Sequence, residues 1–249
     1  MRYELMFPDE MRRALKENLP LVIPVGVMEY HSEHLVLGVD TLVVARALEI
    51  IAEEIPMVLF PPYWLGSASY AVAPPEEKGT LHIPAQTVHK IFSDLFTGLI
   101  RVGFKNIHLF VHHQSENFVA GMPTDLAIKL AARETIFTFL EKTRGEGWWG
   151  SSDMKNYYNE HSQNEDPFSW ISVHPFIDIS TQERFPIDHA GKQETALMAA
   201  FCPEGVDMKK FSGKEWFAQS APESSPEYVK EIKEAILDSL RESLKKKKL

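Results

Sequence analysis

The sequence LVIPVGVMEYHSEHLVLGVD, at residues 21–40, joins an apolar run to a group of acidic and imidazole side chains. Residues 21–27 carry no charge and are rich in β-branched side chains, a pattern typical of a strand buried on both faces of a parallel sheet. Glu29, His31 and Asp40 follow this strand, at the position where open α/β sheets build their sites. Glu29 and His31 are two residues apart and project to the same side of an extended backbone. These side chains suit Zn²⁺ or Mn²⁺; the alternative is a polar loop that only caps the sheet.

Helical and strand-like segments alternate along much of the chain. Apolar residues recur at helical spacing in 41–55, where Asp40 is the expected N-cap, and in 88–102, 126–133, 189–201 and the tail from Pro226 onward. A short helix is also expected within residues 3–18, starting at Pro8. Strands are indicated by the apolar or β-branched runs 57–60, 106–111 and 135–139. This alternation predicts a single α/β domain over residues 1–249, with a mostly parallel sheet and helices on both faces.

The periodicity fails between residues 141 and 186. This segment is rich in Trp, Tyr, Asn and Ser, and it is too aromatic for a disordered linker. We therefore expect an ordered insertion that either lines the site or forms a contact between subunits.

Composition excludes several classes of protein. The net charge of -9 argues against a nucleic-acid partner, because phosphate binding needs a basic face. No apolar run is long enough to cross a membrane, and the N-terminus lacks the apolar core of a signal peptide. Cys202 is the single cysteine, so no intrachain disulfide can form. We expect a cytoplasmic protein that acts on a small molecule.

Two further segments place polar side chains where they could join Glu29, His31 and Asp40. HHQSEN follows the expected strand 106–111, and Asp188, His189 and Glu194 lie at the start of the expected helix 189–201. Three segments with such side chains are less easily explained as a coincidence of surface residues than one segment would be.

Together these motifs resemble the creatininase (creatinine amidohydrolase) family. PVGVMEYHSEHLVLGVD resembles its opening pattern PVG-x-x-E-x-H-x-x-H-L followed by Asp, and GTL at 79–81 resembles its Gly-Thr turn. VHHQSEN lies where the family has Asn-Gly-His-x-x-Asn, and DHAGKQET resembles its His-Ala-Gly-x-x-Glu-Thr signature. The resemblance, from about residue 20 to 205, implies a three-layer α/β/α, Rossmann-like fold, a hydrolytic site with two metal ions, and a homo-oligomer, usually a hexamer.

The resemblance also implies roles for particular residues. Glu29 and Asp40 would hold one Zn or Mn ion, while His31, Asp40 and Glu116 would hold a second. The shared Asp40 would bridge two ions about 3.5–4 Å apart. The sequence alone leaves open whether one ion or two bind.

His189 resembles the family's catalytic histidine, which would donate a proton to the leaving group. Asp188 could shift the protonation of His189 or act in its place. Glu194 could orient His189, or it could form a salt bridge on the helix surface.

The chain departs from the family pattern in HHQSEN. If Asn117 aligns with the family's closing Asn, Gln114 takes the place of a metal-ligating histidine and would be a poor ligand. His113 could serve instead if the strand ends one residue differently. We expect Gln114, Ser115 and Tyr30 to contact the substrate.

The expected activity is hydrolysis of a small cyclic substrate by attack of metal-bound hydroxide on a carbonyl. The departure in HHQSEN and the polar surround favour a cyclic diketone resembling 3-dehydro-scyllo-inosose from inositol breakdown. The alternatives are a cyclic amide or formamide hydrolase, and an inactive relative that serves as a binding subunit. A dinucleotide-binding protein is disfavoured because no G-x-G-x-x-G follows a strand.

Overall fold

A four-stranded parallel sheet forms the centre of the molecule. The computed structural model describes residues 1–67, 70, 72–157 and 167–245. The strands lie in the order β2-β1-β3-β4, and their bounds are β1 Leu21–Val25, β2 Val58–Leu59, β3 Ile107–Val111 and β4 Ile171–Pro175. All three strand pairs are parallel. The central strands β1 and β3 are buried throughout, as the apolar runs at 21–27 and 106–111 predict.

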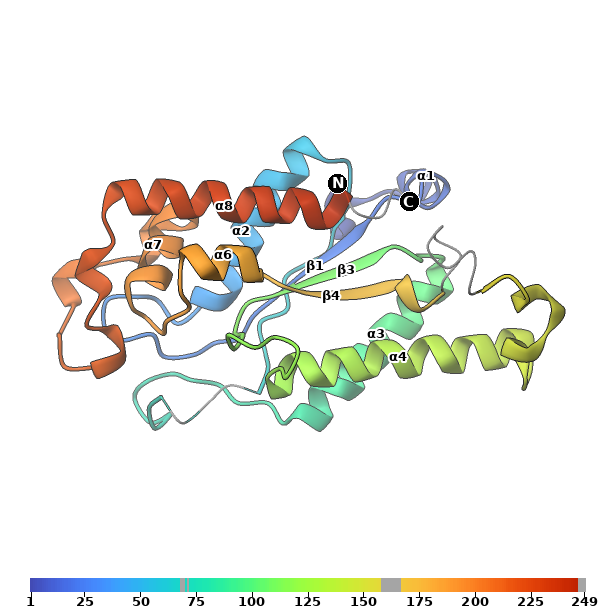
Figure 1. The fold of residues 1–249 in the computed structure, drawn as a ribbon, viewed down its shortest axis with the longest axis horizontal. Helices are drawn as coiled ribbons and strands as arrows, with labels where there is room; N and C mark the ends of the chain where they lie inside the picture. The colour runs from blue at the N-terminus through green and yellow to red at the C-terminus, as the bar shows by residue number, and fades with distance from the viewer. Residues whose placement is uncertain (68–69, 71, 158–166, 246–249) are drawn as a thin grey trace.

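Helices cover both faces of this sheet (Figure 1). Their bounds are α1 Pro8–Lys16, α2 Val39–Glu54, α3 Ala85–Val102, α4 Pro123–Arg144, α6 Ile179–Arg184, α7 Lys192–Phe201 and α8 Pro226–Lys245. Helices α2, α7 and α8 pack on one face in a core that includes Val22 and Phe110. Helices α1, α3 and α4 pack on the other face, against Ile23 and Leu109. The predicted three-layer α/β/α fold is therefore confirmed.

The register of β1 and β3 brings their carboxyl ends together. Val25 pairs with Val111 at the end of both strands, so the residues that follow them leave the sheet at the same edge. The chain segments that carry the expected site residues therefore start side by side.

Gly26 permits the approach of α2 to this edge. A Cβ atom at Gly26 would lie 2.5 Å from the backbone of both Asp40 and Thr41, which is too close for any side chain. Helix α2 begins two residues earlier than expected, so Gly38 is the N-cap and Asp40 lies in the first turn. The prediction that Asp40 caps the helix is wrong, and its carboxylate is free to face the strand ends.

Two predictions of secondary structure are also wrong. The run 135–139 belongs to α4 and is not a strand. The buried face of α4 continues through it, with Ile128, Ala132, Ile136 and Leu140 on one side of the helix. The segment 141–186 is not wholly an insertion, since it contains β4, which pairs with β3.

The aromatic residues that precede β4 pack on α4 and not on the strand ends. Trp148 is buried and lies near Phe137 of α4, and Trp149 lies 5.2 Å from Phe168 between ring centroids. This part of the chain lies at the C-terminal end of α4, at the right of Figure 1. One of our two interpretations was that this segment lines the site, and its described residues do not. Residues 158–166 lie outside the described part. No helix among the described residues has the length and apolarity needed to cross a membrane.

Candidate active site

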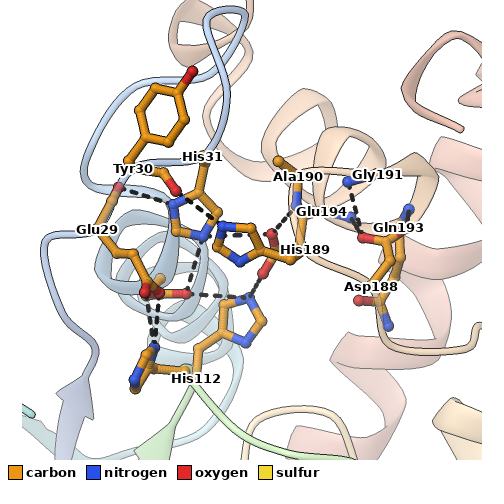
Figure 2. Close-up of polar contacts among 12 residues, drawn as sticks. Glu29, Tyr30, His31, His112, Asp188, His189, Ala190, Gly191, Gln193 and Glu194 are labelled. Carbon is orange, nitrogen blue, oxygen red and sulfur yellow. Dashed lines mark hydrogen bonds and ion pairs between the residues drawn. The ribbon is translucent and has the colours of Figure 1, made fainter. Parts of the chain in front are cut away.

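A cavity of about 540 Å³ opens at the edge where β1 and β3 end. Glu29 and His31 reach this region from the loop after β1, and Asp40 reaches it from the first turn of α2. His112 and His113 follow β3 directly. His189 and Glu194, around the start of α7, complete the group, so three distant segments meet here as expected (Figure 2).

His31, Asp40 and Glu194 form one compact group. His31 Nε2 lies 3.6 Å from Asp40 Oδ1 and 3.4 Å from Glu194 Oε2. His31 Nδ1 donates a hydrogen bond to the backbone oxygen of Glu29 at 2.9 Å. Because Nδ1 carries the proton of the neutral ring, Nε2 presents its lone pair to the two carboxylates. This orientation, with one nitrogen held by a backbone carbonyl, is typical of a metal-binding histidine.

Glu29, Asp40 and His113 form a second group. His113 Nδ1 lies 3.1 Å from Glu29 Oε2 and 3.6 Å from Asp40 Oδ2. Asp40 thus presents Oδ1 to His31 and Oδ2 to His113, and it belongs to both groups. The sequence left open whether Gln114 or His113 takes the place of the family's metal-ligating histidine. In this geometry His113, and not Gln114, faces the acidic side chains.

The electrostatics of this buried edge are dominated by its carboxylates. Glu29, Asp40 and Glu194 are each at most 5% exposed. Burial lowers the pKa of His31, but the Glu194 and Asp40 carboxylates outweigh burial and hold it well above its ordinary value. Burial also lowers the pKa of His113, and Asp40 with Glu29 overcomes this effect and raises it to about 10. The site therefore attracts positive charge, as protons or as metal ions.

His189 lies beside the first group. Its Nε2 lies 2.9 Å from the backbone oxygen of Tyr30, and its ring centroid lies 4.4 Å from that of His31. A carbonyl oxygen only accepts, so Nε2 is the protonated nitrogen and Nδ1 is the atom left for proton transfer. Phe217 packs edge-on against the ring at 5.1 Å and restricts its orientation.

Asp188 lines the cavity, but its oxygens serve the backbone at the start of α7. They accept hydrogen bonds from the N–H groups of Gly191, Gln193 and Glu194. Burial, followed by repulsion from Glu194, raises the pKa of Asp188 to about 6. These contacts make Asp188 a residue that positions Glu194, and they differ from the expected direct role in proton transfer.

Comparison with known proteins places this geometry in a family. The family model described as "Creatininase: Creatinine amidohydrolase" matches residues 4–237. The chain belongs to the creatininase family. This is a family of metal-dependent hydrolases. The creatinine amidohydrolase of Pseudomonas putida is 24% identical over 214 residues, covering 83% of this chain and 74% of that protein.

Solved creatininase structures share the fold. A creatininase variant complexed with creatine gives a TM-score of 0.69 at 20% identity and covers 98% of this chain and 96% of its own. A variant described as Zn-Zn type and a structure described as creatininase Mn each give 0.68, at 21% and 20% identity, with 98% of both chains covered. The similarity therefore extends over the whole creatininase fold.

The structure places two acidic residues differently from what the creatininase resemblance implies. Glu116 lines the cavity but is exposed, and it belongs to none of the three groups of possible ligands found among the described residues. Glu194 takes the place beside His31 and Asp40 that we expected for Glu116. The sequence signal for Glu194 was present in the Glu-Thr of DHAGKQET, but helical spacing alone could not show which group its carboxylate faces.

The three residues expected to contact substrate have other partners. Gln114 lines the cavity, but its amide bonds both the N–H and the carbonyl of Ile177 at 2.9 Å. Ser115 also lines the cavity and donates to the Asn117 oxygen. The Tyr30 hydroxyl donates to Glu33 at 2.7 Å, away from the acidic groups (Figure 2). Gln114 and Tyr30 thus hold the loops around the site.

His112 is a residue of the site that sequence reasoning left without a role. It is 3% exposed, and its Nε2 lies 3.6 Å from Glu194 Oε1 and 4.0 Å from Asp40 Oδ1. The histidine pair after an apolar strand was the available signal.

Proposed function

We propose that this chain hydrolyses a small cyclic amide and that its site holds two divalent ions, Zn²⁺ or Mn²⁺. The observation that carries the proposal is the position of Asp40 between two groups of ligands. Its Oδ1 lies 3.6 Å from His31 Nε2, and its Oδ2 lies 3.6 Å from His113 Nδ1. A carboxylate with one oxygen in each group is suited to bridge two cations.

The donor set fits such ions. Imidazole nitrogens and carboxylate oxygens are the ligands of Zn²⁺ and Mn²⁺ in proteins. Several buried atoms of the site have no hydrogen-bond partner among the described residues, namely His31 Nε2, Asp40 Oδ2, both ring nitrogens of His112, and His113 Nε2. Buried polar atoms are normally paired, so cations held by His31 Nε2 and Asp40 Oδ2 would explain why these two atoms are not. His31, Asp40 and Glu194 would hold one ion, and Glu29, Asp40 and His113 would hold the other.

Bound divalent ions polarise a carbonyl and lower the pKa of water, so that hydrolysis can proceed at neutral pH. The chain's own residues supply the rest. His189 is fixed by Tyr30 and Phe217. Its Nδ1 can accept the proton that the attacking water releases and pass it to the departing nitrogen. Asp188 holds the backbone of Glu194 in place. Trp216 and Phe217 line the cavity and can exclude water from it.

The comparisons favour the cyclic amide over the cyclic diketone that we first expected. The curated relative is named creatinine amidohydrolase, and one similar structure is described as complexed with creatine. The polar residues that suggested a polyol-derived diketone are largely bonded to the protein itself, as Gln114 is to Ile177. The diketone remains an outcome that the substrate screen can reveal.

An inactive binding subunit is the less supported alternative. That hypothesis took Gln114 as a lost ligand, and His113 supplies an imidazole to the same acidic group. A homo-oligomer, expected as a hexamer, is part of the proposal. Trp216, at the cavity, is 82% exposed in a single chain, and a neighbouring subunit would cover it. A cytoplasmic location and the absence of a nucleic-acid partner stay predictions.

The substrate proposal is tested by a screen. Purified protein loaded with Zn²⁺ or Mn²⁺ is incubated with creatinine and other lactams, with cyclic formamides, and with cyclic diketones. We expect ring opening of a lactam, loss of activity after chelation and recovery when the ion returns. Turnover of a diketone alone would contradict the cyclic-amide proposal, and activity that survives complete metal removal would contradict the metal-dependent mechanism.

A further inference from the structure

His112 has a setting that structural packing does not explain. It follows β3, where its backbone N–H donates to the Val25 oxygen at 3.0 Å, so the sheet fixes its position. Its ring lies 5.4 Å from that of Phe176 between centroids. Neither ring nitrogen has a hydrogen-bond partner among the described residues. A buried histidine that only fills space would leave a donor and an acceptor unsatisfied at a considerable energetic cost.

The ring of His112 points toward Glu194, on the side where Glu194 faces His31 (Figure 2). His112 Nε2 approaches Asp40 Oδ1, the same oxygen that faces His31, at 4.0 Å. It approaches Glu194 Oε1 at 3.6 Å, while His31 faces the other oxygen of that carboxylate. Two imidazole nitrogens therefore converge on the same two carboxylates.

We propose that His112 is a fourth protein ligand of the ion held by His31, Asp40 and Glu194. This inference rests on the proposed function, because it presumes that the site holds metal. The inference adds to the proposed function that the two ions have different numbers of protein ligands. One ion has two imidazoles and two carboxylates, whereas the ion at Glu29, Asp40 and His113 has three protein ligands.

The distances suit this assignment. Four ligand atoms placed about 2.0–2.1 Å from a tetrahedral Zn²⁺ lie roughly 3.4 Å from one another. His31 Nε2 lies 3.4 Å from Glu194 Oε2 and 3.6 Å from Asp40 Oδ1. His112 Nε2 lies 3.6 Å from the other Glu194 oxygen, Oε1, and 4.0 Å from Asp40 Oδ1. His112 lies outside the group of ligand atoms that are all within 4.8 Å of one another, so its ring must move closer and the Glu194 carboxylate must turn for all four side chains to hold one ion.

The difference in the number of protein ligands implies different roles for the two ions. Closed four-ligand sites are typical of structural zinc, whereas catalytic zinc keeps an open position beside three protein ligands. The ion at His31 would therefore act mainly to hold Asp40 and Glu194 in place. The ion at His113 would keep the open position where the carbonyl of the substrate can bind.

The test uses Co²⁺, which takes zinc sites and whose visible absorption is strong in four-coordinate and weak in six-coordinate sites. Wild-type protein and His112→Gln are titrated with Co²⁺ by calorimetry and by absorption. We expect wild type to bind two ions per chain, one of them with a strong four-coordinate band. In His112→Gln that band should weaken, and the affinity of one ion should fall at least about tenfold, which is the lower end of the loss caused even by removing a partner of a ligand.

His108→Gln is the matched control. His108 is a buried histidine on β3, the strand that His112 follows, and it is held by His174 and Asn106 outside the cavity. It should leave both Co²⁺ affinities and the spectrum unchanged. Circular dichroism establishes that each variant is folded, and His112→Ala replaces His112→Gln if the latter is not.

The outcomes separate the two proposals. A folded His112 variant with the isotherm and spectrum of wild type would overturn the role of His112 while leaving the two-ion site intact. A wild-type protein that binds no Co²⁺, Zn²⁺ or Mn²⁺ would overturn the proposed function and this inference together.

Discussion

His31 and Asp40 lie nine positions apart in the sequence, yet His31 Nε2 and Asp40 Oδ1 face each other at 3.6 Å at the buried end of the sheet. The loop after β1 returns to the first turn of α2, and Gly26 allows that helix to touch the strand end. The pairing of an imidazole nitrogen with carboxylates is repeated at His113 and makes this edge of the sheet favourable for positive charge.

His189 is predicted to be the proton donor. His189→Ala should keep its metal and its fold but lose about 10²–10⁴ in kcat, the usual contribution of a positioned acid or base. Steady-state kinetics on the substrate found by the screen would measure the loss. Lys192→Ala is the control, because Lys192 contacts Glu223 and the Tyr228 ring instead of the acidic groups. Near wild-type turnover of His189→Ala would transfer the role to another group.

Gln114 is predicted to act on stability more than on catalysis. Its amide satisfies both the N–H and the carbonyl of Ile177, so Gln114→Ala should lower the free energy of unfolding by about 1–3 kcal/mol. Denaturant unfolding measures this change. Ser115→Ala, which removes only a local bond to Asn117, should change it by less than about 0.5 kcal/mol. A stable Gln114→Ala protein with a raised KM would instead support the substrate contact expected from the sequence.

Asp178 is predicted to make stability depend on pH. It caps α6 by accepting from the Thr181 N–H and also accepts from Ser239 of α8. Burial raises its pKa, but these hydrogen bonds outweigh burial and lower the pKa below the ordinary value of 3.8. Its contribution is therefore full above pH 3.8 and is lost as the pH falls through the lower folded-state pKa.

Asp178→Ala should consequently cost about 0.5–2 kcal/mol at neutral pH, as expected for the loss of a helix N-cap. The difference from wild type should shrink in acid. Urea unfolding at a series of pH values below 5 would measure it. An equal cost at every pH would show that the charge of Asp178 contributes nothing.

The sequence predicted the fold where a segment's own pattern was sufficient. The apolar run 21–27 and the helical spacing of 88–102 correspond to β1 and α3. The run 135–139 was misassigned because β-branched residues favour strands, while in the structure the continuing apolar face of α4 overrides that preference. β4 was missed because Ser172 and His174 interrupt its apolar residues and only Ile171 in it is fully buried, so it lacks the apolar run of β1 and β3.

The candidate site was predictable to a similar extent. Residues that leave adjacent parallel strands must emerge together, so Glu29, His31 and His113 could be expected to meet. The choice between Glu116 and Glu194 could not be made from sequence. It depends on how Gln114 holds the loop to Ile177 and on where the start of α7 lies over the sheet.

Asp40 would help to hold both ions, and the metal content of the Asp40→Asn variant tests this most directly. Elemental analysis of wild type after loading with Zn²⁺ or Mn²⁺ should give two ions per chain, and Asp40→Asn should lose most of both. Glu33→Gln is the control, because Glu33 lies on the same loop but contacts Tyr30 and Lys78 at the surface. Its metal content should match that of wild type. A folded Asp40→Asn protein that retains two ions would contradict the bridging site and the mechanism built on it.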